Sequence, residues 1–208
     1  TFEKGTDLTL GKTSFVEELT LNTSDTSGFE SAIKAAKAAD VVVMVLGEHG
    51  FQSGEARSRT SLDLPGNQQQ LLEAVFQVNP NIVLVLNNGR PLAIPWAAKN
   101  IPAIVEAWHL GTQTGNAVAQ VLYGDYNPSG KLPMTFPRNV GQCPIYYNTY
   151  SSGRPENSEN NVFWSHYSDV EKTPQFPFGF GLSYTTFAYK NLKLNKTSYA
   201  KGEPIQVA

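Results

Sequence analysis

The sequence predicts an α/β fold, in which a mostly parallel sheet is flanked by helices as a three-layer α/β sandwich. Residues 41–46 and 82–86 are unbroken apolar runs of strand length, and such runs suit strands covered on both faces, as in a parallel sheet. Segments with helical spacing of apolar residues alternate with these runs. Alternation with short connections implies right-handed crossovers and therefore parallel strands.

The first helix is expected to begin at a capping box formed by Ser27 and Glu30, and to close at Asp40 just before the first strand. A second helix follows residues 64–66 and ends at Asn-Pro-Asn, residues 79–81, because proline cannot continue the hydrogen-bond ladder. The alternation is completed by three further elements, which are a short helical turn around 96–98, a third strand over 103–108, and a helix over 114–122 that Gly124 stops.

Residues 26–140 are therefore expected to form the sandwich domain. Residues 1–25 are weakly patterned and predict a linker or a partial first piece of that domain, and residues 141–182 predict an irregular connection rich in Gly, Pro and aromatic residues. Residues 183–208 predict the incomplete start of an all-β domain. Its strand candidates alternate as if one face were solvated, and they are residues 185–189, 192–194 and 205–207.

Composition and missing motifs exclude several classes of function. The 208 residues carry a net charge of −2, with 16% charged residues, so the basic footprint of a nucleic-acid binder is missing. No apolar stretch approaches the roughly 18 residues that a membrane span needs. The histidines are scattered without ligand spacing, and no phosphate-binding glycine motif or serine nucleophile elbow is present. We therefore expect no metal and no cofactor.

The loop after the first predicted strand carries the densest chemistry. Parallel sheets bind ligands beyond the carboxyl ends of their strands, and the three strand ends carry Glu48, Asn88 and Trp108. Glu55 lies farther along the same long loop, which is of the kind that is often functional. A glutamate in such a loop is more often a solvated or salt-bridged surface group than a catalytic residue. Position alone leaves both interpretations open.

The chain resembles the C-terminal half of glycoside hydrolase family 3, the β-glucosidase and β-xylosidase family. The resemblance rests on four separated blocks in the family's order, residues 47–59, 88–92, 124–133 and 177–187. It implies an N-terminal (β/α)8 barrel that precedes the sandwich, and often a fibronectin type III-like domain that follows it. It also implies a retaining mechanism, in which a barrel aspartate attacks the sugar and a sandwich glutamate acts as the general acid/base.

Family block by family block, Ser53-Gly54-Glu55 matches the acid/base segment, so the resemblance assigns that role first to Glu55. Glu48 is the second choice, or else a hydrogen-bonding residue of the rim. The resemblance also suggests substrate-binding roles for four neighbours, because the two arginines can orient carboxylates and the other two can face the leaving group. These four residues are Arg57, Arg59, Phe51 and Gln52.

The expected partners are an oligosaccharide or glycoside substrate and the missing barrel, with no nucleic acid and no membrane. The resemblance favours the periplasm or the outside of the cell, and this chain alone is expected not to hydrolyse glycosides. A non-catalytic carbohydrate-binding or assembly module derived from such an enzyme is the alternative. A flavodoxin-like binder of small ligands is disfavoured by the missing phosphate loops. The sugar, its linkage and the oligomeric state stay open.

Overall fold

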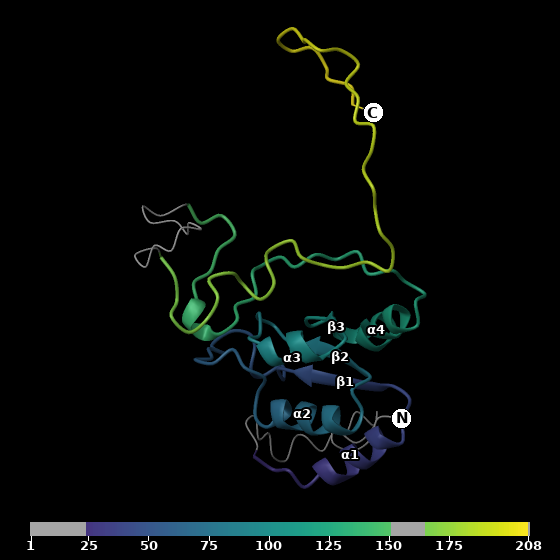
Figure 1. The fold of residues 1–208 in the computed structure, drawn as a ribbon, viewed down its shortest axis with the longest axis vertical. Coiled ribbons are helices and arrows are strands. Elements are labelled where there is room, and N and C mark those ends of the chain that lie inside the picture. Colours follow the sequence, from purple (N-terminus) through teal and green to yellow (C-terminus); the bar gives the residue numbers. More distant parts are fainter. Residues whose placement is uncertain (1–23, 151–164, 208) are drawn as a thin grey trace.

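Three parallel strands form the sheet at the centre of this protein, in the order β1-β2-β3. They are β1 (Val42–Gly47), β2 (Ile82–Asn87) and β3 (Ala103–Glu106). The computed structural model describes residues 24–150 and 165–207, and all structural statements concern those residues. The predicted α/β class with a parallel sheet is confirmed (Figure 1).

Helices alternate with these strands along the chain, as predicted (Figure 1). They are α1 (Phe29–Lys37), α2 (Gln68–Val78), α3 (Pro95–Asn100) and α4 (Thr114–Leu122), with short 3-10 turns at Gly111–Gln113 and Val140–Gln142. Asn79, at the end of α2, donates from Nδ2 to Ala36 O at 2.9 Å and to Ala39 O at 2.7 Å. The segment that stops α2 therefore also binds one carbonyl in the last turn of α1 and one just beyond it.

The capping box predicted at Ser27 is wrong. The Ser27 N–H and hydroxyl both donate to the carboxylate of Asp25, at 2.8 and 3.0 Å. Gly28 occupies the N-cap position of α1, without a side-chain cap. A carboxylate two residues upstream is the stronger local acceptor, so the serine turns back toward it and away from the helix.

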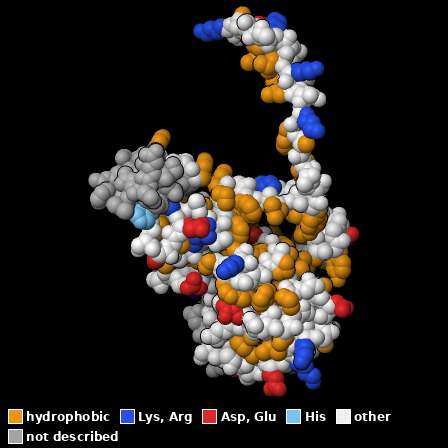
Figure 2. Space-filling view, in the orientation of Figure 1, with side chains coloured by type: hydrophobic (Ala, Val, Ile, Leu, Met, Phe, Trp, Pro, Cys, Tyr) orange, Lys and Arg blue, Asp and Glu red, His pale blue; other side chains and the backbone are white. Residues whose placement is uncertain are grey.

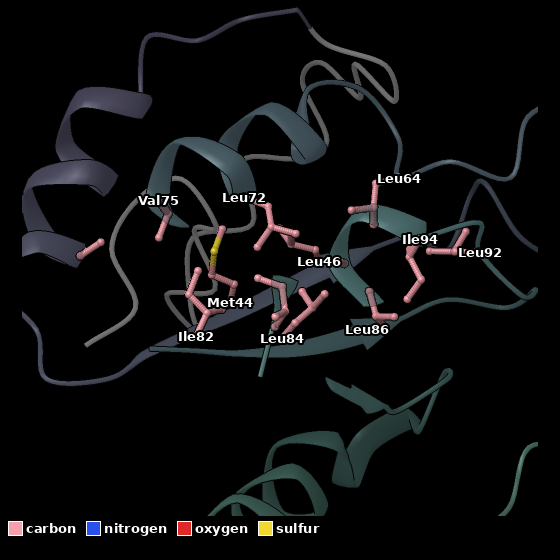
Figure 3. Packing of buried hydrophobic residues seen from close by; sticks show 13 residues of the cluster. Met44, Leu46, Leu64, Leu72, Val75, Ile82, Leu84, Leu86, Leu92 and Ile94 are labelled. Carbon is pink, nitrogen blue, oxygen red and sulfur yellow. The ribbon is translucent and has the colours of Figure 1, made fainter. Parts of the chain in front are cut away.

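The hydrophobic core lies on one face of the sheet, beneath α2 and α3 (Figure 3). Met44 and Leu46 of β1 point into it, whereas Val43 points to the opposite face and is 42% exposed. The prediction that the first strand is covered on both faces is therefore wrong for β1. The buried members of the core are Ala36, Met44, Leu46, Leu64, Leu72, Val75, Ile82, Leu84, Leu86, Leu92, Ile94, Ala97 and Ile101.

The third strand is two residues shorter than predicted. It ends at Glu106, and Trp108 then adopts a φ of +52°, which an extended strand cannot contain. Below this turn, Trp108 packs edge-on against Phe136 at 5.8 Å, and Phe136 packs against Phe176 at 6.2 Å. A bulky residue accepts the unfavourable backbone conformation where its ring is held by tertiary packing.

The two later sequence blocks lie side by side, although about fifty residues separate them. Leu132 N–H donates to Phe180 O, and Gly179 N–H donates to Leu132 O, each at 2.8 Å. The Tyr184 hydroxyl donates to Val121 O at 2.6 Å and joins the block 177–187 to the end of α4. These blocks therefore bring the chain back to the sandwich and carry no cluster of chemically reactive groups.

The C-terminal arm after residue 184 extends away from the sandwich (Figure 1), and Figure 2 shows hydrophobic side chains along it. Its described residues form one antiparallel bridge, Leu194 with Val207, and residues 185–189 form no strand. The strand prediction for 185–189 is wrong, because an alternating pattern needs a partner strand to hydrogen-bond with. A fibronectin-like domain stays a prediction. The segment 1–25 lies almost wholly outside the described residues, as does part of 141–182.

Candidate active site

The strand ends form a level rim, because the register aligns them. Gly47 is paired with Asn87, and Leu86 with Glu106. Gln68, in the first turn of α2, accepts from the Gly47 N–H at 2.7 Å and donates to the Gly47 carbonyl at 2.8 Å. Both backbone groups at the end of β1 are thereby satisfied, so the loop that follows leaves the sheet from a fixed point.

Glu48, the first residue after β1, is buried and fully engaged. Its side chain is 0% exposed, and Oε1 accepts from Arg59 Nη1 at 2.8 Å. Arg90 Nε lies 2.9 Å from the same oxygen, as an ion pair whose N–H does not point along the contact. The other oxygen, Oε2, accepts from the Gly89 N–H at 3.1 Å. One carboxylate therefore joins the ends of β1 and β2 and forms ion pairs with two guanidinium groups.

The loop from Glu48 to Arg59 is folded by local hydrogen bonds. Gln52 is buried, and its Oε1 accepts from the His49 N–H at 2.9 Å, while its own N–H donates to the His49 carbonyl at 2.7 Å. Arg57 N–H donates to Gly54 O at 3.1 Å and closes a turn with Ala56 at a φ of +57°. We define the tip as residues 53–56, and Glu55 is exposed on it.

Arg90 reaches this loop from the segment after β2. Its Nη2 donates to the carbonyl of Gln52 at 2.5 Å and to the carbonyl of Arg57 at 2.8 Å. The two carbonyls lie on either side of the tip. One guanidinium thus contacts both ends of the tip, while its Nε contacts Glu48.

Phe51 presents an aromatic ring beside the tip. Its side chain is 51% exposed, the Arg57 guanidinium lies 5.3 Å from the ring centroid, and His49 stacks on it at 5.4 Å. A cation and a second ring hold Phe51 in place and leave part of its surface open to solvent. An exposed ring held in this way offers a flat apolar surface on which a ligand can stack.

Glu106 is a partly buried carboxyl at the same rim, at the end of β3. Desolvation raises the pKa of Glu106 to about 7. Hydrogen bonds from the Trp108 N–H and the Asn88 amide lower this pKa and offset part of the effect. Glu106 Oε1 accepts from the Trp108 N–H at 3.1 Å, and Oε2 lies 3.4 Å from Asn88 Nδ2. Asn88 also donates to Arg90 O at 2.8 Å, so the third strand end is joined to the second.

The structure brings together most of the residues that the sequence singled out. Glu48 and Arg59 form one ion pair, while Glu55, Phe51 and Arg57 share the exposed part of the loop. Gln52 uses its side chain within the loop rather than at its surface. None of these placements by itself tests a catalytic role.

Sequence reasoning missed the roles of Arg90, Gly89 and Glu106. Arg90 and Gly89 lie in the second resembling block, residues 88–92, whose separation from the loop by more than thirty residues hides the contact. Glu106 ends a strand, which is a position that could have marked it as a rim carboxyl. Its burial follows from packing and could not be inferred from its neighbours in the sequence.

Two kinds of feature do not occur in the described part of the chain. Among those residues, no group of three or more His, Cys, Asp or Glu side chains is arranged to hold a metal ion. None of the described helices is long and apolar enough to cross a membrane.

Comparison with known proteins identifies the family. The family model described as "Glycosyl hydrolase family 3 C-terminal domain" matches residues 5–184. A periplasmic beta-glucosidase of Salmonella typhimurium is 50% identical over 167 residues, which are 80% of this chain and 22% of that protein. A beta-xylosidase of Formosa agariphila is 46% identical over 189 residues, 91% of this chain and 25% of that protein.

Solved structures give the same result. A beta-glucosidase from Listeria innocua superimposes with a TM-score of 0.77 at 38% identity, over 85% of this chain and 24% of that one. A beta-glucosidase from Kluyveromyces marxianus, solved in complex with glucose, does so with a TM-score of 0.63 at 31% identity, over 83% of this chain and 20% of that one. The chain spans about a quarter of the length of the relatives it matches.

Proposed function

Since this chain belongs to glycoside hydrolase family 3, matching its C-terminal domain, we propose that it supplies the general acid/base of a retaining β-glycosidase and that Glu55 is this residue. The proposal assigns the nucleophile to an aspartate on an N-terminal barrel. Glu55 would protonate the leaving oxygen while that aspartate attacks the sugar, and would then take a proton from the water that releases the glycosyl-enzyme. The two carboxyl groups would approach to about 5 Å when the domains meet.

The observation that carries the proposal is the contrast between the two loop glutamates. Glu55 is exposed on the tip, where the leaving oxygen of a substrate bound by the barrel could reach it. Glu48 has a side chain that is 0% exposed, with both oxygens already occupied by the two arginines and the Gly89 N–H. Only the first arrangement leaves a carboxyl available for proton transfer to a ligand.

The proposed substrate is a terminal β-linked glucosyl or xylosyl unit, since relatives of both kinds are named beta-glucosidase and beta-xylosidase. Phe51 would stack on the leaving group, and Arg57 would hold the ring in place. We propose a periplasmic or secreted location, supported by the relative named as periplasmic. Fractionation of cells that express the full gene would test it.

The catalytic proposal is tested in a chimera. This chain replaces the segment that it matches in the Salmonella typhimurium β-glucosidase, and Glu55→Gln and Glu48→Gln are compared. Loss of a general acid lowers the reaction rate by about 10²- to 10⁴-fold. With Glu55→Gln, kcat/KM should fall by that factor for phenyl β-glucoside, whose leaving group needs a proton, and far less for 2,4-dinitrophenyl β-glucoside.

A small anion provides the second readout. Azide needs no base catalysis, so it should restore the turnover of dinitrophenyl β-glucoside by Glu55→Ala and yield β-glucosyl azide. Leaving-group selectivity and azide rescue in Glu48 variants, with neither in Glu55 variants, would assign the role to Glu48 instead. A folded chimera that binds glucose but is inactive with every glycoside would favour a non-catalytic module.

A further inference from the structure

We propose that Arg90 is a positioning residue for Glu55, which it serves by holding both ends of the tip against the rim of the sheet. The inference rests on the proposed function of Glu55 and adds a residue to it. Arg90 Nη2 donates to Gln52 O and to Arg57 O, the carbonyls that precede and follow the tip. Four residues of loop, including Glu55, are thus tied down at both ends by one side chain.

The guanidinium is itself fixed in place. Its Nε lies 2.9 Å from Glu48 Oε1, and the backbone of the same segment donates from Gly89 N to Glu48 Oε2. The Arg90 side chain is only 21% exposed, so these contacts are shielded from water. Arginine presents a planar fork of donors that reaches both carbonyls from Nη2, whereas a lysine is a compact point charge without that fixed geometry.

Gly89 forms the floor beneath the tip. A Cβ atom there would overlap the hydroxyl of Ser53, the first residue of the tip. The absence of a side chain at this position lets the loop approach the end of β2 closely enough for Arg90 to reach both carbonyls. Two neighbouring residues therefore act on the tip: Gly89 leaves room for Ser53, and Arg90 hydrogen-bonds to both ends.

The tip needs such a clamp because its own backbone is unusual. Gly54 has a φ of +130° and Ala56 a φ of +57°, the latter unfavourable for a residue with a side chain. Conformations of this kind persist when surrounding contacts enforce them. Proton transfer demands a carboxyl held to within about half an ångström, so slack at either carbonyl would displace Glu55 from the leaving oxygen.

Arg59 provides a matched control within the chain. It contacts the same Glu48 oxygen at 2.8 Å, but its second contact is the carbonyl of Asp63, outside the tip. Arg59→Lys therefore perturbs the shared ion pair while leaving the carbonyls of Gln52 and Arg57 untouched. Arg90→Lys perturbs both.

The first experiment follows amide hydrogen exchange in this chain. Arg90→Lys should speed the exchange of the Arg57 amide about tenfold, which corresponds to the loss of one charge-assisted hydrogen bond. Arg59→Lys should leave it within about twofold of the wild-type rate, and β2 amides should be unaffected by either change. Equally faster exchange of the Arg57 amide in both variants would refute the role of Arg90 in holding the tip. Unchanged exchange in Arg90→Lys would refute it as well.

The second experiment measures kcat and KM in the chimera. Arg90→Lys should lower kcat/KM for phenyl β-glucoside at least tenfold more than for 2,4-dinitrophenyl β-glucoside, because kcat/KM reports the step that forms the glycosyl-enzyme and only the phenyl leaving group needs the proton from Glu55 in that step. A folding defect would lower both equally. If Arg90→Lys does not fold, Gly89→Ala replaces it, since it displaces Ser53 at the start of the tip while leaving the Arg90 side chain in place. Equal losses on both substrates, while Glu55→Gln remains selective, would refute the positioning role. If Glu55→Gln shows no selectivity, the proposed function fails instead, and the exchange data alone still decide whether Arg90 holds the tip.

Discussion

The backbone N–H of Gly89 donates to Glu48 Oε2 at 3.1 Å, which joins two residues that are 41 positions apart in the sequence. Glu48 follows β1 and Gly89 follows β2, so this hydrogen bond crosses the rim between neighbouring parallel strands. Arg59 and Arg90 contact the other carboxylate oxygen, so Glu48 links the segments after β1 and β2 at the candidate site.

The two loop glutamates should differ sharply in their contribution to stability. Glu48→Gln leaves the guanidinium groups of Arg59 and Arg90 partly buried and uncompensated, which should lower the free energy of unfolding by about 3 kcal/mol. Glu55→Gln changes an exposed side chain and should stay within about 0.5 kcal/mol of wild type. Urea unfolding of both variants checks this, and similar midpoints for the two would contradict the assignment of Glu48 as a structural tie.

Two glycines should respond to alanine in opposite directions. Gly89→Ala places a Cβ atom where the Ser53 side chain lies, which should cost about 1–3 kcal/mol. Gly115 lies inside α4, and a Cβ atom added there would meet nothing within 4 Å, so Gly115→Ala should stabilise the protein by about 0.5–1 kcal/mol through helix propensity. Thermal unfolding of the pair provides the comparison. A stabilising Gly89→Ala would mean that the loop does not rest on Gly89.

Glu106 should make stability fall as the pH rises. Burial raises its pKa from 4.5 to about 7, so the folded protein binds the proton more tightly than the unfolded chain. Its contribution is complete below about pH 4.5 and is lost as the pH rises to about 7, by roughly 1–3 kcal/mol. Glu106→Gln should remove this part of the slope when urea midpoints at pH 5 and pH 8 are compared.

The matched control for this pH effect is Glu30→Gln, because Glu30 is exposed in the first turn of α1. It should leave the slope between pH 5 and pH 8 as in wild type. A Glu106→Gln protein with an unchanged slope would show that Glu106 ionises freely in the folded state.

Asn79 should connect the stability of α1 to that of α2. Asn79→Ala removes the hydrogen bonds to the carbonyls of Ala36 and Ala39, and should cost about 1–2 kcal/mol. Asn116→Ala is a suitable control, because Asn116 is exposed on α4 and bonds to the nearby Gln113 side chain. Hydrogen exchange should show the α1 amides opening more readily in Asn79→Ala alone. Equal effects on both helices in both variants would contradict the link.

The strands and helices were predictable where a local pattern determined them. Apolar runs of strand length and helical spacing identified β1, β2 and α2, and Asn79-Pro80-Asn81 marked the end of α2. The predicted start of α1 and the predicted end of β3 were wrong because tertiary or local contacts compete with the sequence pattern there. Asp25 draws Ser27 away from the helix start, and packing of Trp108 on Phe136 ends β3 early.

The sequence by itself determined the α/β class, the family and the loop that carries Glu48 and Glu55, because these follow from short-range patterns and contiguous blocks. Tertiary structure alone decided which glutamate is buried and which is exposed. That choice depends on Arg59 and Arg90, and Arg90 is brought to the loop by the register between β1 and β2. Long-range pairing of this kind is set by strand alignment and packing, and no local pattern within either segment encodes it.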